Sequence, residues 1–158
     1  MKNKLITVTL AILSLIATQT TAQDFFPIKI GELNDGIPTI TYNINQLKQE
    51  WQANIAANSS TTIIFNVITI EQVEGFYFLI GTNSNNSITA FVQLVKNGNS
   101  LYQKKEQQVG ALSGKTVVCV GCETTGCRPN GRGGCTPQCN DQCSAIKVES
   151  QLGIVGGS

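Results

Sequence analysis

The 158-residue chain contains no histidine. This absence excludes Ser-His-Asp and Cys-His nucleophile systems, histidine-ligated catalytic zinc and proton transfer by histidine. A pair of carboxylates can still hydrolyse glycosides. However, the ten Asp and Glu residues are scattered along the chain, and none lies in a recognisable catalytic setting. We therefore expect a protein that is not an enzyme and that uses no cofactor.

Charged residues are also scarce, at 13% of the chain. Two of the eleven Lys and Arg residues are Lys2 and Lys4, so nine remain beyond the N-terminal segment, against ten Asp and Glu. A nearly neutral domain lacks the basic surface that attracts nucleic acid or an anionic membrane. We expect no nucleic-acid partner.

Long apolar runs are missing except at the N-terminus, which has the pattern of a secretory signal peptide. Lys2 and Lys4 precede an apolar run over residues 5–16, and small residues at 20–22 come before Gln23. The run is shorter than the ~20 residues that cross a bilayer. No cysteine follows it to carry a lipid. We expect cleavage after residue 22 and a secreted or periplasmic product of bacterial type, with no membrane anchor after cleavage.

Changes in composition along the sequence predict five segments. They are a signal peptide at 1–22, a leader at 23–36, an α+β domain at 37–105, a Cys-rich module at 115–147 and a tail at 148–158.

One segment, residues 43–60, has the apolar period of a helix. Asn43 and Gln46 are a plausible capping pair at its start, and Asn58-Ser59-Ser60 ends it. The apolar stripe consists of Ile44, Leu47, Trp51 and Ile55. We expect this stripe to be buried in the core.

Strand patterns surround the helix. The β-branched, aromatic and alternating segments lie at residues 37–43, 61–70, 76–82, 87–95, 100–105 and 115–120. Pro38 favours an edge position for the first of them, and the short connections require antiparallel neighbours. We predict an α+β fold with one helix packed on a four- to five-stranded antiparallel sheet, followed by a disulfide-rich, Gly-rich C-terminal module.

The hairpin that follows the second predicted strand carries a short motif, Glu71-Gln72-Val73-Glu74-Gly75. Together with the order of helix and strands, it resembles the Gln-x-Val-x-Gly hairpin of cystatins, which inhibit papain-like cysteine proteases. Val73 and Gly75 match that motif, whereas Glu71 stands where the family has Gln. The next hairpin has Asn97-Gly98 in place of the family's Pro-Trp wedge. The resemblance implies a cystatin-like fold and, as an alternative function, inhibition of a cysteine protease through Glu71, Val73 and Gly75.

All six cysteines lie in one Gly-rich stretch: Cys119, Cys122, Cys127, Cys135, Cys139 and Cys143. Zinc binding through Cys119, Cys122, Cys139 and Cys143 is one interpretation. A redox dithiol at Cys119 and Cys122 is disfavoured, because the residues that follow cannot hold the helix such a site needs. The number of cysteines is even, the chain is exported, and residues 122–143 contain no Leu, Ile, Val or Phe. We therefore predict disulfide bonds, whose pairing the sequence does not choose.

Arg128 and Arg132 lie on the longest loop between cysteines. Guanidinium groups on an anchored loop can contact a carboxylate, a phosphate or an anionic glycan. We expect an exported, non-enzymatic binding or structural protein whose partner is a protein or a surface glycan. The alternatives are cysteine protease inhibition and extracytoplasmic metal binding.

Overall fold

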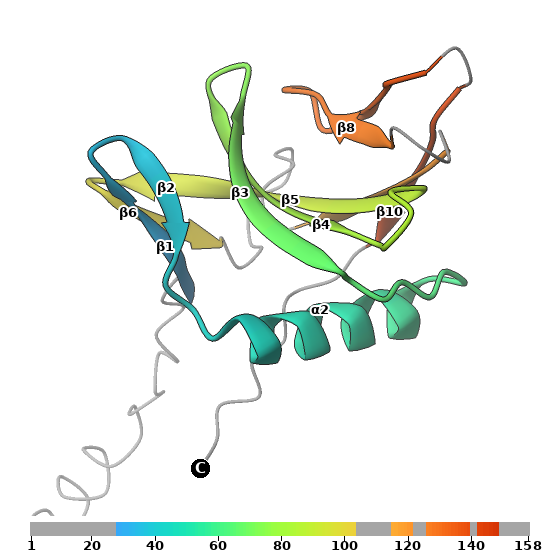
Figure 1. Ribbon diagram of the computed structural model, residues 1–158, viewed down its shortest axis with the longest axis horizontal. Coiled ribbons are helices and arrows are strands. Elements are labelled where there is room, and N and C mark those ends of the chain that lie inside the picture. Colours follow the sequence, from blue (N-terminus) through green and yellow to red (C-terminus); the bar gives the residue numbers. More distant parts are fainter. Residues whose placement is uncertain (1–27, 104–114, 122–125, 140–141, 149–158) are drawn as a thin grey trace, which may run out of the picture.

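The computed structural model describes residues 28–103, 115–121, 126–139 and 142–148 (Figure 1). In chain order its elements are β1 (Ile28–Asn34), β2 (Ile37–Ile40), α2 (Ile44–Asn58), β3 (Val67–Val73), β4 (Phe76–Thr82), β5 (Ile88–Asn97), β6 (Ser100–Gln103), β7 (Thr116–Val120), β8 (Cys127–Pro129), β9 (Cys135–Pro137) and β10 (Ser144–Val148).

The main sheet is antiparallel and branches at β5. One edge of β5 pairs with β4, which in turn pairs with β3. Along its other edge, the first half of β5 pairs with β7 and the second half with β6. β10 then extends the sheet beyond β7, while β1 and β2 extend it beyond β6. The described residues thus form an eight-stranded sheet, so the predicted four to five strands were too few. The described part of the chain holds one helix, as predicted, but more sheet than a balanced α+β domain.

Residues assigned to the leader and to the Cys-rich module supply the additional strands of this sheet. β1 lies within residues 23–36 and pairs with β6. β7 lies within residues 115–147, as does β10 except for its last residue, Val148, and the two strands pair with each other. The signal peptide at 1–22, the start of the leader and residues 149–158 of the tail lie outside the described residues. Pro38 lies in β2 at an edge of the sheet, as predicted.

Two of the tight hairpins have the turn that right-handed strand twist favours. Asp35 and Gly36 connect β1 to β2 with φ of 50° and 82°, and Glu74 and Gly75 connect β3 to β4 with φ of 51° and 85°. Positive φ at both central residues is the requirement of a type I′ turn. Asp-Gly between alternating apolar residues was therefore a sequence signal for the β1–β2 hairpin.

The helix begins and packs as its sequence indicates. The side chain of Asn43 accepts hydrogen bonds from the backbone N–H groups of Asn45 and Gln46, both at 3.1 Å. The buried stripe consists of Leu47, Trp51 and Ile55. Ile44, also expected in the stripe, is 42% exposed. Ile44 shares the angular position of the stripe but is the first residue of the helix, so its exposure comes from its place at the helix end.

Trp51 is the centre of the inner core, which lies between α2 and the sheet. Its ring is fully buried, with its centroid 4.7 Å from that of Phe65. The indole N–H donates to the hydroxyl of Thr116 in β7 at 2.9 Å. The inner core also contains Ile30, Leu33, Ile68, Ile70, Leu79, Val92, Leu94, Leu101, Val118 and Val148. The first and last of the described strands, β1 and β10, therefore share one core.

Within the described part of the chain, no helix has the length and apolar character to cross a membrane.

Candidate functional site

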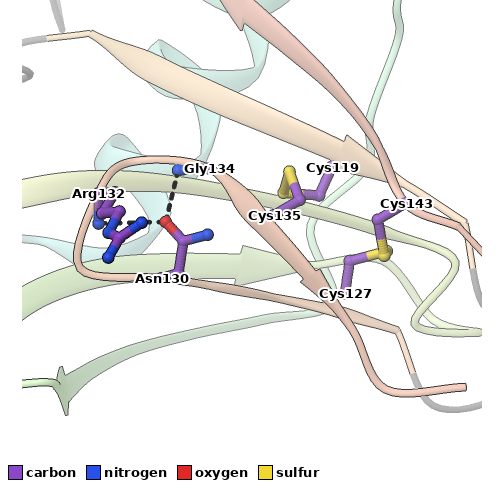
Figure 2. Close-up of a disulfide and its surroundings, with 7 residues drawn as sticks. All are labelled: Cys119, Cys127, Asn130, Arg132, Gly134, Cys135 and Cys143. Atoms are coloured by element: carbon purple, nitrogen blue, oxygen red, sulfur yellow. Dashed lines mark hydrogen bonds between the residues drawn. A yellow bond between two sulfur atoms is a disulfide. The ribbon is translucent and has the colours of Figure 1, made fainter.

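The C-terminal cysteines are disulfide-bonded, as predicted. Cys119 bonds to Cys135 and Cys127 bonds to Cys143, with Cα–Cα distances of 5.8 and 6.1 Å (Figure 2). Cys139 is also disulfide-bonded, and Cys122 lies outside the described residues. The structure thus makes two of the pairings that the sequence left open.

These bonds hold a small cap, which we define as residues 126–139, against the main sheet. The cap consists of the β8–β9 hairpin and its connecting loop, and it lies on the side of the sheet opposite α2 (Figure 1). The bond from Cys119 in β7 to Cys135 in β9 joins the sheet to the cap. The bond from Cys127 to Cys143 joins the start of β8 to the residue just before β10.

Beneath the cap lies a second cluster of buried side chains, which we call the outer cluster. Its members are Phe78, Ile80, Phe91, Val117, Cys119 and Cys127. The rings of Phe78 and Phe91 meet edge to face with centroids 5.7 Å apart, a favoured aromatic geometry. Both faces of β4 are therefore buried, the inner by α2 and the outer by the cap. This explains the unbroken apolar run Phe78-Leu79-Ile80.

The hairpin between β3 and β4 contacts the cap at two points. The guanidinium of Arg128 forms an ion pair with the carboxylate of Glu71 at 3.2 Å. The backbone N–H of Gly131 donates to the carboxylate of Glu74 at 3.0 Å. Val73, between them, packs against the outer cluster. Four predicted binding residues from two distant segments thus lie around one junction: Glu71, Val73, Gly75 at the turn, and Arg128.

Arg132 lies apart from this junction, in the loop that joins β8 to β9. The side-chain oxygen of Asn130 accepts from the backbone N–H groups of Arg132 at 3.1 Å and Gly134 at 2.8 Å (Figure 2). Gly133 N–H also donates to the carbonyl of Asn130 at 3.0 Å. The loop backbone is therefore held in one shape, and it presents an exposed guanidinium.

The zinc interpretation required thiolates at Cys119, Cys122, Cys139 and Cys143. Cys119 and Cys143 are bonded to other cysteines, and Cys139 is bonded as well. A disulfide sulfur is not the thiolate ligand that zinc requires. Among the described residues, no three His, Cys, Asp or Glu side chains are grouped to hold a metal ion.

A cleft of about 180 Å³ opens between the cap and the sheet; we call it the cap cleft. Its walls come from β3, β4, β5, the β4–β5 turn and β8. The lining residues are Glu71, Ile80, Thr82, Asn86, Thr89, Gly126, Cys127, Arg128 and Pro129. Polar groups therefore surround an apolar floor, and the Glu71–Arg128 ion pair lies at its wall.

Sequence reasoning missed Thr82, Thr89 and Asn86 as site residues. Thr82 and Thr89 are cross-strand partners on β4 and β5, and both point to the outer face, since Ile80 and Phe91 two residues away do so. The local signal was a pair of threonines flanking the turn in otherwise apolar strands. Recognising it required knowing that a cap covers this face.

No protein-family model matches this chain, and no curated protein or solved structure matches it either.

Proposed function

We propose that this chain is an exported binding or structural protein, rather than an enzyme, and that its cap carries the binding surface. The observation that carries the proposal is the disulfide-bonded cap seated on the sheet. Disulfides indicate an oxidising, extracytoplasmic environment, which agrees with the signal-peptide pattern of residues 1–22. A covalently held loop can present polar groups at low entropic cost on binding.

Two features of the cap support binding. The cap cleft collects hydroxyl, amide, carboxylate and guanidinium groups at one place. The exposed Arg132 on its ordered loop can form charge-assisted hydrogen bonds to a carboxylate or an anionic glycan. A protein or a surface glycan is therefore the partner class we propose.

Fractionation of the producing cells tests the proposal. We expect the protein in the extracytoplasmic fraction, with a mature mass that begins at Gln23 and a mass increase of two hydrogens per bond on reduction. The purified mature protein should then co-sediment with isolated envelope material. Arg132→Gln should weaken this retention, whereas the matched control Lys96→Gln, an exposed charge on the β5–β6 hairpin, should leave it intact. A cytoplasmic protein with free thiols would contradict the proposal.

Inhibition of a cysteine protease through the β3–β4 hairpin stays an alternative proposal. It rests on the resemblance of residues 71–75 to the cystatin hairpin. The contacts of Glu71 with Arg128 and of Glu74 with Gly131 compete with it, because a hairpin held against the cap is less free to enter a cleft. Titration of papain with the mature protein tests this alternative, and full papain activity at micromolar protein would reject it.

A further inference from the structure

The cap cleft has one feature that points to a ligand: a polar side chain with almost no exposure that faces the cavity. Thr89 is 3% exposed and lines the cleft. Among the described residues its hydroxyl is not one of the fully enclosed polar atoms that lack a partner, so the hydroxyl opens into the cleft. A threonine hydroxyl can donate and accept a hydrogen bond. A ligand group in the cleft can therefore bond to it.

The polar groups of the cleft offer both hydrogen-bond roles within a small space. The carboxylate of Glu71 only accepts, the guanidinium of Arg128 only donates, and a threonine hydroxyl does both. The first two are already paired at 3.2 Å, so their charges balance locally. A ligand with net charge would therefore disturb the pair, whereas neighbouring neutral hydroxyls can donate to Glu71 and accept from Arg128 without separating the charges.

The remaining walls are apolar. Ile80 and the disulfide-bonded Cys127 belong to the outer cluster, and Pro129 is buried next to them. Such walls suit the C–H face of a ring. A volume of about 180 Å³ lies below the ~300–1,000 Å³ of pockets for drug-sized ligands. It limits the occupant to a small group.

From these groups we infer that the cap cleft binds a single neutral sugar ring, presented free or at the end of a glycan. Vicinal hydroxyls of the ring contact Glu71 and Arg128, a further hydroxyl meets Thr89, and the C–H face packs on Ile80 and Pro129. This inference rests on the proposed binding function and gives it a ligand class.

A second hollow lined by described residues is larger, at about 370 Å³, but its chemistry is different. It lies beside the segment before β3, and its lining includes the 76% exposed Ile64. The amide of Asn83 is already engaged by Ser87 and by the backbone of Ile88. This hollow provides no charged group and no buried hydroxyl facing it, so it serves as the internal control.

Nuclear magnetic resonance of the isotope-labelled mature protein, with its disulfides intact, tests the inference. The probes are glucose, galactose, mannose and N-acetylglucosamine, with serine as a zwitterion and inorganic phosphate as an anion. We expect at least one sugar to shift the amide signals of Thr82, Thr89, Gly126 and Arg128 at millimolar concentration. Thr89→Val, which keeps the side-chain shape, should weaken that binding about tenfold, the effect of one lost hydrogen bond. Thr62→Val, in the larger hollow, should bind like the wild type.

The outcomes separate this inference from the proposed function. If serine or phosphate, and no sugar, shifts these amides, the sugar assignment is overturned while a binding role for the cap stands. If none of the probes shifts them, the inference is overturned, and the proposed function is judged by envelope binding of the Arg132→Gln variant alone. Sugar-induced shifts that persist unchanged in Thr89→Val would also overturn the assignment. Circular dichroism of each variant verifies that it is folded.

Discussion

Trp51 joins the helix to the sheet both by the packing of its buried ring and by a hydrogen bond. Its ring is fully buried, and its indole N–H donates to Thr116 in β7. The single tryptophan of the chain thus connects α2 to a strand that lies next to the cysteines. This single hydrogen bond joins two elements whose residues are 65 positions apart.

Replacing Trp51 with Phe should lower the free energy of unfolding by about 1–3 kcal/mol. The variant removes the buried hydrogen bond from the indole to Thr116 and part of the ring volume. Urea denaturation measures the change. Ile44→Ala, at the exposed end of the same helix, is the control and should change stability by no more than about 0.5 kcal/mol. Equal losses in the two variants would contradict this role of Trp51.

Tyr42 gives the stability a dependence on alkaline pH. Burial, the nearby charge of Glu50 and the hydrogen bond to its carboxylate at 3.5 Å raise the pKa of Tyr42. A raised pKa in the folded state means that stability is complete below the unfolded pKa near 10 and decreases as the pH rises above it. The stability of the wild type relative to Tyr42→Phe should therefore fall above about pH 10. A constant difference would show that Tyr42 does not titrate abnormally.

At the scale of elements, the β3–β4 hairpin both connects two strands of the sheet and contacts the cap. Its Glu74-Gly75 turn closes two strands of the sheet, and its carboxylates contact the cap. The ion pair of Glu71 and Arg128 is surface-exposed, with 36% and 61% of the side chains accessible, and such pairs contribute at most about 1 kcal/mol. The hairpin therefore positions the cap more than it stabilises the fold.

Gly75→Ala should destabilise the protein by about 1–2 kcal/mol, because Gly75 has φ of 85°, where an L side chain is strained. A Cβ at this position meets no atom within 4 Å, so the loss is conformational and not steric. Gly75→Asn is the control and should lose less, since Asn tolerates left-handed backbone. Thermal denaturation compares the two variants, and an alanine variant as stable as the wild type would contradict the type I′ turn.

At the scale of the whole molecule, the cap covers the face of the sheet that the helix leaves uncovered, so that both faces are buried. The helix covers one face of β4 and β5, and the cap covers the other (Figure 1). The cap itself contributes few apolar atoms, so its disulfides supply the stability that burial alone cannot. Loss of these bonds should expose the outer cluster while the inner core remains.

Two double variants test this arrangement: Cys119→Ala with Cys135→Ala, and Cys127→Ala with Cys143→Ala. Both bonds span 16 residues, so the loop-entropy model predicts the same loss of about 3 kcal/mol for each. Any difference between the two variants reports on contacts in the folded state. Both should bind a hydrophobic dye more strongly than the wild type and keep their far-ultraviolet dichroism. An unchanged melting temperature would contradict the role of the bonds.

Local patterns predicted the helix, its cap at Asn43, its buried stripe and the strands β4 and β5 nearly to the residue, because each depends on neighbours a few positions apart. The β1 strand was missed because the glycine, asparagine and aspartate residues within 23–36 indicated a loose leader. Asp35-Gly36 in fact marks the hairpin to β2, and only the pairing with β6 depends on a segment distant in the sequence. For the candidate site, the sequence predicted individual residues but not how they come together. Glu71 and Arg128 were both named, but their contact across 57 positions was not.

The sequence alone determined the absence of histidine chemistry, the cysteine-rich segment and the amphipathic helix, because composition and short-range period are properties of the chain itself. Only the tertiary structure decided that β7 and β10 join the main sheet, that Cys119 pairs with Cys135, and that a polar cleft lies beneath the cap. These features arise where segments far apart in sequence bury surface together. That burial depends on which faces the fold leaves uncovered, and no local pattern specifies this.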